Sequence, residues 1–162
     1  MRVAVITLSD SGYAGLRVDQ SGPAIVQMME QAGFQVVHTC LLPDNRQLLA
    51  QELCRLCDNG LTELILTTGG TGFSPTDQTP EATMQVIERL TPGIPEAMRW
   101  HSLQITPRAM LSRAVAGIRG GTLIVNLPGS PKAVRECLEF LLPSLSHGLE
   151  LLMGTTGECA RS

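Results

Sequence analysis

A glycine-rich segment followed by a carboxylate is the first place in this sequence where residue types and spacing suggest chemistry. Residues 66–77 read LTTGGTGFSPTD, in which GGTG spans 69–72 and Asp77 lies five residues after the last glycine. Glycines let the backbone approach a ligand closely, and their exposed N–H groups can form an anion-binding nest. The segment therefore predicts a site for a small anionic or carbonyl-rich ligand, with candidate contacts at Thr68, Gly69, Gly70, Thr71 and Gly72.

The segment differs from the two commonest phosphate-binding motifs. It lacks the lysine of a Walker P-loop, and its glycine spacing does not match G-x-G-x-x-G. Asp77 has two open interpretations, as a turn residue or as a ligand of a divalent cation beside a phosphate. If the loop wraps a ligand, a Cβ at Gly70 would meet that ligand. We therefore expect Gly70→Ala to weaken substrate binding more than it lowers thermal stability.

Alternating strand and helix patterns in the first half of the chain would position this segment. Continuous apolar, β-branched runs predict strands buried on both faces at 2–8, 34–41 and 63–67. Helical patterns lie between and after them, at 21–33, 45–60 and 79–90, the last with Thr79 as its cap and Pro80 in its first turn. This order predicts a mostly parallel sheet with helices on both faces.

The second half of the chain has a different pattern. Short helices are predicted at 95–104 and 107–112, and a final helix at 130–154 with a break near Pro143. Gly120-Gly121 predicts a hairpin between strands 114–119 and 122–127, one of which must run antiparallel to the rest. The expected fold is an α/β three-layer sandwich formed by a single domain over 1–153, with a short tail at 154–162.

Composition excludes several classes of function. The chain has 162 residues with 43% hydrophobic content and no apolar run of the roughly 20 residues that a membrane span needs. Its net charge of -3, lack of a basic cluster and 3% aromatic content argue against nucleic acid as a partner. No signal-peptide pattern opens the sequence. We expect a cytoplasmic protein that acts on small molecules.

Cysteines and histidines suggest structural roles. The five cysteines include a Cys54–Cys57 pair inside a helical pattern, with no second pair and no histidine at ligand spacing. Buried or half-buried free thiols are the favoured interpretation, although a zinc or redox role for the pair stays open. His38, His101 and His147 are interpreted as structural residues.

The loops that follow the predicted strands share one composition. SDSG (9–12), PDN (43–45), TTGGTG (67–72) and NLPGSPK (126–132) each follow a strand. Ligands bind beyond the carboxyl ends of strands in open parallel sheets. Any single loop of this kind could be an ordinary turn, but four at one edge predict a site there. The last loop adds four candidates, Asn126, Pro128, Gly129 and Lys132, whose lysine opens a helix with an anion-favouring N-terminus.

Three longer stretches resemble a known family. GGTGFSPTDQTPEAT, LLPDN and ITPRAMLSRAVAGIRGGTLIVNLPGSPKAV are similar to the molybdopterin adenylyltransferases of molybdenum cofactor biosynthesis. These are the MogA- and MoaB-like proteins and the related domains of gephyrin and plant Cnx proteins. The resemblance implies that Asp44 and Asp77 are catalytic and bind Mg²⁺. It places Ser102, Ser112 and Arg113 where the family contacts the pterin and its phosphate. Without it, Asp44 could simply begin the helix that follows.

The resemblance implies a reaction and an assembly. The reaction is adenylylation of molybdopterin by ATP, and the assembly is a homotrimer that hands its product to a molybdenum insertase. Trp100 and methionine-rich helices could supply an apolar interface. Two alternatives stay open, a catalytically silent molybdopterin-binding paralogue and a non-enzymatic interaction module. Retention of both aspartates argues against the silent paralogue.

Overall fold

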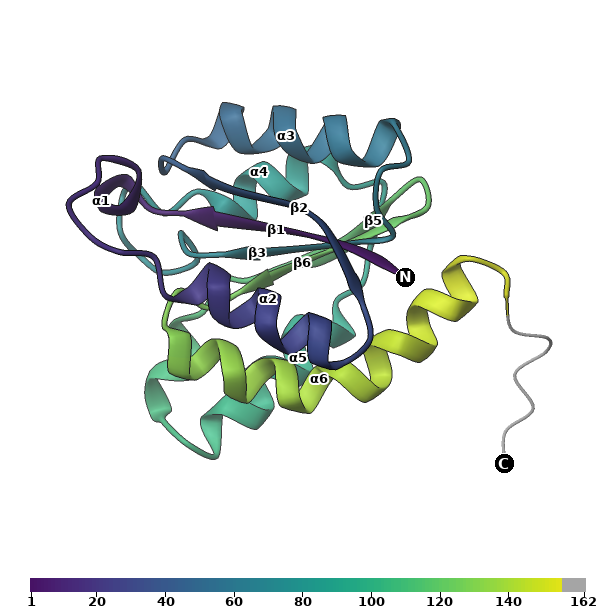
Figure 1. Cartoon of the computed structure of the whole chain (residues 1–162). Helices are drawn as coiled ribbons and strands as arrows, with labels where there is room; N and C mark the ends of the chain where they lie inside the picture. Colours follow the sequence, from purple (N-terminus) through teal and green to yellow (C-terminus); the bar gives the residue numbers. More distant parts are fainter. Residues whose placement is uncertain (156–162) are drawn as a thin grey trace.

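A six-stranded sheet forms the middle layer of the protein, which we describe from a computed structural model over residues 1–155 (Figure 1). The strand order is β2-β1-β3-β6-β5-β4. The strands are β1 (Arg2–Leu8), β2 (Gln35–Leu42), β3 (Leu64–Thr68), β4 (Arg89–Leu90), β5 (Ala116–Arg119) and β6 (Thr122–Leu127). The helices are α1 (Asp10–Tyr13), α2 (Ser21–Gln31), α3 (Arg46–Asp58), α4 (Thr79–Val86), α5 (Gly93–Leu103), the 3₁₀ helix η1 (Pro107–Leu111) and α6 (Pro131–Leu152).

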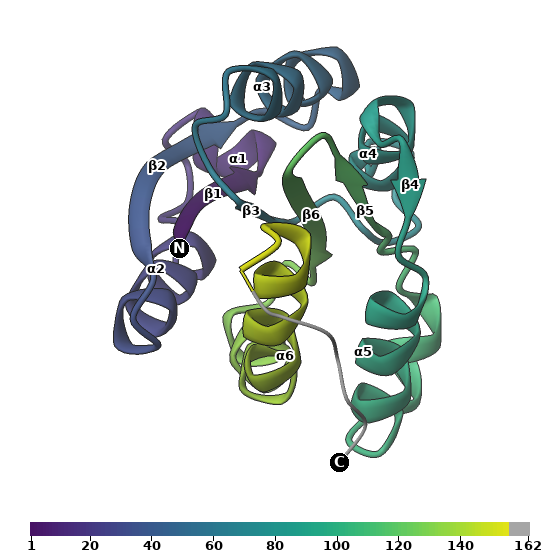
Figure 2. The same cartoon turned by 90° about the vertical axis from the view of Figure 1, so that its right-hand side faces the viewer.

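Helices cover both faces of the sheet, as Figure 2 shows. One core packs α2, α5 and α6 against the sheet through side chains such as Ile25, Met98 and Leu138. The opposite core packs α3 and α4 through side chains such as Leu53 and Val86. β3 and β6, in the middle of the sheet, are buried at every position. The α/β three-layer sandwich predicted from the sequence is confirmed.

The predicted hairpin supplies the antiparallel strand. β1, β2, β3 and β6 pair in parallel, whereas β5 pairs antiparallel with β6 through Gly120 and Gly121. Gly120 has a φ of 54°, the left-handed conformation that such a tight turn requires. All the carboxyl ends of the parallel strands consequently meet at one edge of the sheet.

The predicted helix over 79–90 is wrong in its second half. α4 ends at Val86, and Ile87 is extended with φ -72° and ψ 148°. Arg89 and Leu90 then form β4, which pairs antiparallel with β5. The backbone N–H of Glu88 donates to the Ile118 carbonyl, so a non-local ladder replaces the helical bonds that the local pattern favours. Thr79 is also not the cap, since it lies inside α4 and its hydroxyl donates to the Gly69 carbonyl.

The predicted break near Pro143 does not occur. α6 continues through Pro143 as one helix of 22 residues. Pro143 lies on the exposed face, where water can satisfy the carbonyl left without a donor, while Leu141 and Leu145 anchor the buried face on either side. The short helix α1 after β1 was not predicted.

Among residues 1–155, none of the helices combines the length and the apolar character needed to cross a bilayer. Of the predicted tail at 154–162, residues 156–162 lie outside the described part of the chain.

Candidate active site

The GGTG loop (residues 69–72) leaves the end of β3 in a left-handed conformation. Gly69 has φ 97° and Gly70 has φ 63°, which are backbone angles that residues other than glycine rarely adopt. Thr79 fixes this first half of the loop, because its hydroxyl donates to the Gly69 carbonyl at 2.9 Å and its N–H donates to the Gly70 carbonyl at 3.1 Å. A Cβ on Gly70 would collide with the Thr79 hydroxyl. Gly70 therefore faces the protein at this position, contrary to the expectation that a Cβ there would meet a ligand.

Arg113 fixes the second half of the loop and the segment that follows it. Its N–H donates to the Thr71 carbonyl at 2.9 Å, and its Nε donates to the Gly72 carbonyl at 2.6 Å. Its Nη2 donates to the Asp77 carbonyl at 2.5 Å, and its Nη1 forms an ion pair with Glu81. One guanidinium thus ties both ends of the segment between Gly72 and Asp77 to α4.

These contacts orient the loop. All four carbonyls of the GGTG loop accept hydrogen bonds from Thr79 or Arg113. Within the part of the chain that the structure describes, none of the loop's N–H groups donates to a protein acceptor. The carbonyls are therefore all engaged in hydrogen bonds within the protein, and the N–H groups stay available for an anion.

Two carboxylates flank the loop. A Cβ on Gly70 would lie 3.3 Å from Asp44 Oδ1, and one on Gly72 would lie 2.9 Å from Asp77 Oδ2. Asp77 Oδ2 also accepts the Ser74 N–H at 3.0 Å, which is a turn contact. Asp44 does not cap α3, because Asn45 performs that function by accepting the N–H groups of the first turn. The Asp44 carboxylate is therefore left for another role.

The surroundings of Asp44 are acidic. Its Oδ2 accepts the Asp10 N–H at 3.0 Å, and its own N–H donates to Asp10 Oδ1 at 2.9 Å. Burial raises the pKa of Asp44 above its ordinary value, and the charges of Asp10 and Asp77 raise it further, against the lowering effect of the Asp10 hydrogen bond. Negative charge from Asp10, Asp44 and Asp77 is therefore concentrated here.

A cavity of about 280 Å³ lies on one side of the loop, which we call the α5 cavity. Thr71 and Gly72 form its wall toward the loop, and the side chains of Ser102 and Ser112 line it from α5 and the end of η1. The structure thus brings together two serines that are ten residues apart in sequence with the loop that the sequence singled out. Pro128 also lines this cavity.

A second cavity of about 110 Å³ lies on the other side, which we call the β1 cavity. Gly69 and Thr68 line it from β3, Gly129 and Pro131 from the start of α6, and Ser9 from the end of β1. A further hollow of about 480 Å³ contains Asp77, Glu81 and Arg113. Three of the four predicted loops, at 9–12, 67–72 and 126–132, therefore contribute residues to these hollows, whereas the loop at 43–45 lines none of the three.

Two predicted contacts have other partners in the structure. Asn126 is fully buried. Its Nδ2 donates to the Thr67 and Thr83 hydroxyls, and its Oδ1 accepts the Val115 N–H. Contact with a substrate would require these hydrogen bonds to break. Thr68 is also buried, with its hydroxyl donating to the Pro128 carbonyl.

Two predicted cations lie beside the cavities or support the loop. Lys132 lines none of the described cavities; it is 81% exposed, and its Nζ lies 3.9 Å from Glu136. Arg113 braces the loop through the carbonyl contacts described above. In this structure Lys132 lies near Glu136 and Arg113 contacts the loop carbonyls and Glu81.

Sequence reasoning missed three residues of the site. Arg99 and Arg108 line the α5 cavity, and Arg99 donates to the Ala114 carbonyl at 3.0 Å. Asp19 lines the β1 cavity, accepts the Thr7 hydroxyl and accepts the Ser21 N–H at the start of α2. An aspartate two residues before SGP was a readable capping signal. The arginines gave no local signal, since only the packing of α5 and η1 brings Arg99 and Arg108 to the cavity.

The cysteines agree with the structural interpretation. Cys54 is half-buried and Cys57 is buried, both on α3, and both are free thiols. Burial raises the pKa of Cys57 to about 11. Cys159 lies outside the described residues.

Comparison with known proteins identifies the family. Residues 4–147 match the family model described as a probable molybdopterin binding domain. A molybdopterin adenylyltransferase of Helicobacter pylori (strain J99) is 40% identical over 156 residues, which are 95% of this chain and 89% of that protein. The chain belongs to the molybdopterin adenylyltransferase family. Gephyrin of Dictyostelium discoideum is 46% identical over 160 residues, which are 93% of this chain but 22% of gephyrin.

The fold comparison agrees with the family. The crystal structure of the molybdopterin biosynthesis enzyme MoaB from Thermus thermophilus is 47% identical with a TM-score of 0.89, covering 94% of this chain and 96% of that one. The family resemblance drawn from the GGTG, LLPDN and NLPGSPK stretches is thereby confirmed. The Helicobacter pylori relative is a molybdopterin adenylyltransferase, which places this chain among the enzymes of molybdenum cofactor biosynthesis.

Proposed function

We propose that this protein transfers the adenylyl group of ATP to the terminal phosphate of molybdopterin, giving adenylyl-molybdopterin and pyrophosphate. The observation that carries the proposal is the GGTG loop itself. Its carbonyls are all bound by protein donors, its N–H groups are unused among the described residues, and cavities lie on both of its sides. Such a loop suits two phosphate-bearing substrates that must meet between two pockets.

The α5 cavity is the proposed molybdopterin pocket. Ser102 and Ser112 offer hydroxyls that both donate and accept, which matches the edge of a pterin ring. Arg99 and Arg108 supply positive charge for the substrate's phosphate. The apolar part of the wall, including Met98 and Pro128, suits the flat faces of the ring.

The β1 cavity is the proposed nucleotide pocket. It contains Arg17, the hydroxyls of Ser9 and Ser21, and the first turn of α6 at Pro131. A helix N-terminus favours phosphate through its free N–H groups and its dipole. A Cβ on Gly129 would lie 3.4 Å from the Gly69 Cα, so both walls of this cavity are bare backbone at that point.

Nucleotidyl transfer requires that the protein align the two substrates and neutralise the negative charge on their phosphates. We propose that the loop N–H groups hold the oxygen atoms that gain negative charge. The Arg113 contacts keep the loop and the Asp77 segment in one arrangement during the reaction. Asp44 and Asp77 cannot hold phosphate directly, since like charges repel.

Magnesium fits the acidic side of the loop. Asp44 and Asp77 offer only oxygen ligands. Burial, followed by the charges of Asp10 and Asp77, raises the pKa of Asp44, so a cation bound there would stabilise its carboxylate. Mg²⁺ commonly uses one or two carboxylates together with phosphate oxygens and water. When bound by these two aspartates, it would neutralise charge on the phosphates of the two substrates.

The Asp77→Asn variant tests the proposal together with a direct assay. Protein, molybdopterin, Mg²⁺ and labelled ATP should yield labelled adenylyl-molybdopterin. The variant should abolish transfer while leaving molybdopterin binding nearly intact, because asparagine can still accept the Ser74 N–H but carries no charge for a cation. Binding without turnover by the wild type would favour the silent paralogue. Turnover by the variant at near wild-type rate would leave Asp77 as a turn residue.

We also propose a homotrimer that passes its product to a molybdenum insertase. A contiguous stretch of α5 and η1 carries exposed apolar side chains, with Trp100 63% and Met110 63% exposed, which is a cost that an interface would remove. Gephyrin, of which the matching region is 22%, carries the same domain within a longer chain. That arrangement is the support for a partner that acts next on the product.

A further inference from the structure

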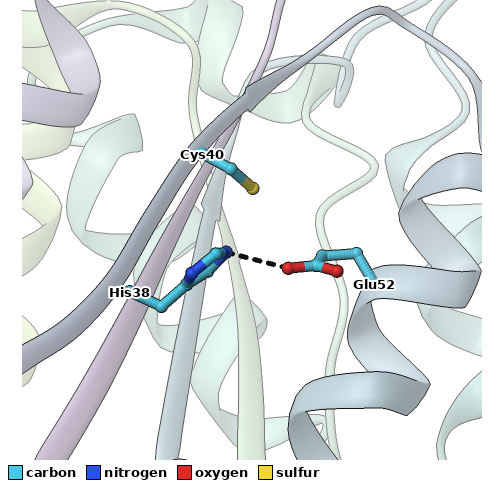
Figure 3. A group of neighbouring side chains, drawn as sticks. All are labelled: His38, Cys40 and Glu52. Carbon is cyan, nitrogen blue, oxygen red and sulfur yellow. Dashed lines mark ion pairs between the residues drawn. The ribbon is translucent and has the colours of Figure 1, made fainter.

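Three metal-ligating side chains meet on the α3 side of the sheet, away from the GGTG loop. His38 and Cys40 lie two residues apart on the edge strand β2, so both point to the same face. Glu52 faces them from α3, as Figure 3 shows. One ligand atom from each residue lies within 4.8 Å of the other two. Among residues 1–155, this is the one group of three or more His, Cys, Asp or Glu side chains with that property.

The donor set is selective. Imidazole nitrogen, thiolate sulfur and carboxylate oxygen are the three ligand types that zinc accepts together. Tetrahedral zinc has bonds of about 2.0–2.3 Å, which separate its ligand atoms by roughly 3.5 Å. The His38, Cys40 and Glu52 atoms lie within 4.8 Å of one another, so zinc binding requires them to approach by at most about 1 Å. Calcium and magnesium do not suit the sulfur and nitrogen ligands.

The His38 ring has a buried nitrogen whose contact with Glu52 is poorly directed. Its Nε2 lies 2.8 Å from Glu52 Oε1 as an ion pair, yet the contact does not have the geometry of a hydrogen bond. A metal ion between the two side chains would give this nitrogen a well-directed bond. The close approach to Glu52 shows that both side chains aim at one point.

Glu52 has lone pairs left for a metal. Its Oε2 accepts Arg55 Nε at 2.8 Å, and its Oε1 accepts Arg55 Nη2 at 2.7 Å. A carboxylate has four lone-pair positions, so Glu52 can keep Arg55 and still accept a cation. Cys40 is a half-buried free thiol. A bound metal would displace the thiol proton to solvent.

We propose that His38, Cys40 and Glu52 bind one Zn²⁺ ion, with a fourth position open to water, and that this ion ties the edge strand β2 to α3. Cys40, Leu42 and Cys54 all pack against the buried layer between the sheet and α3. This apolar layer covers the inner side of the site. The site is separate from the proposed Mg²⁺ site at Asp44 and Asp77. Its role is structural, since β2 is an unprotected edge that pairs with β1 alone.

Cobalt substitution tests the site independently of adenylyl transfer. Protein freed of metal by a chelator is titrated with Co²⁺ in a Cys159→Ser background, which removes the thiol outside the described residues. The expected result is one equivalent of bound Co²⁺ with thiolate-to-cobalt charge-transfer absorption in the near ultraviolet, lost on adding Zn²⁺. Saturating Zn²⁺ should also raise the melting temperature. No charge-transfer band at stoichiometric cobalt would overturn the proposal.

Matched variants locate the ligands. Cys40→Ser and His38→Gln should each lose the charge-transfer band and the zinc-dependent rise in melting temperature. Cys54→Ser is the control, because it removes another half-buried thiol on α3 and should keep both signals. Circular dichroism of the metal-free variants establishes that they are folded, and Glu52→Gln serves where either ligand variant does not fold. A band that persists in Cys40→Ser, or disappears in Cys54→Ser, would refute the assignment.

Discussion

Replacing Arg113 by lysine separates two roles for this residue. The family resemblance implies that Arg113 contacts the substrate's phosphate, whereas the structure shows its guanidinium bound to the carbonyls of Gly72 and Asp77 and paired with Glu81. Lysine keeps the positive charge but has a single ammonium group at the end of a flexible chain. It can preserve the ion pair and at most one of the two carbonyl contacts.

The expected loss follows from those contacts. A hydrogen bond that involves a charged group contributes about 1.5–3 kcal/mol. The Arg113 side chain is 33% exposed, so solvent screening favours the lower end of that range, about 1.5–2 kcal/mol for one lost bond. In a domain of this size, about 1 kcal/mol lowers the melting temperature by roughly 2–4 °C. The variant should therefore melt roughly 3–8 °C lower, and kcat should fall roughly 10- to 30-fold if the same free energy is lost from the alignment of the loop.

The assay measures melting temperature, kcat and the KM for molybdopterin on the same preparations. Glu81→Gln is the matched control, because it removes the ion pair and leaves both carbonyl contacts. An exposed ion pair contributes about 0–1 kcal/mol, so this control should melt closer to the wild type. An unchanged melting temperature in Arg113→Lys together with a raised KM would refute the bracing role. That result would instead favour direct contact between Arg113 and the phosphate of the substrate.

Three further outcomes are expected. Gly70→Ala should lower the melting temperature strongly, since its Cβ would collide with the Thr79 hydroxyl at a positive φ, whereas Gly129→Ala adds only an ordinary contact and should melt like the wild type. Asp44→Asn should abolish transfer yet melt no lower than the wild type near pH 7. A carboxyl whose pKa is raised on folding destabilises the folded state above its unfolded pKa. Any gain in melting temperature of Asp44→Asn over the wild type should therefore vanish in acid, where the carboxyl is protonated in both states. Sedimentation at micromolar concentration should give a trimer, and Trp100→Glu a monomer; a wild-type monomer would refute the assembly.

Local patterns were sufficient for the fold class and for the loop at the site. β3 and β6 each contain a run of three consecutive apolar residues because both faces of these strands are covered, and that signal is readable in the sequence alone. Gly120-Gly121 specified a turn by its own conformational freedom. GGTG and Asp77 were found because clustered glycines and a nearby carboxylate directly follow a predicted buried strand, at the edge of the sheet where ligands bind.

Other features depended on partners distant in sequence. The helical pattern of 79–90 gave way at Ile87 because β5 offers backbone hydrogen bonds to Glu88 and Thr91. Pro143 stayed helical because it lies on the exposed side of α6. A local pattern cannot reveal which face of a helix will be covered, or which strand will find a free edge.

The sequence by itself was sufficient to predict the sheet, to locate the glycine loop and to single out Asp44 and Asp77 as candidate site residues. Each of these predictions depends on local conformational preference or on a short motif. Tertiary structure alone decided what those residues contact. It turned Gly70 toward Thr79, assigned Arg113 to the loop carbonyls, and brought Arg99 into the α5 cavity. It also placed Glu52 against His38 and Cys40. Hydrogen-bond and metal partners are set by the packing of whole elements, and the free energy of that packing is not encoded in any single segment.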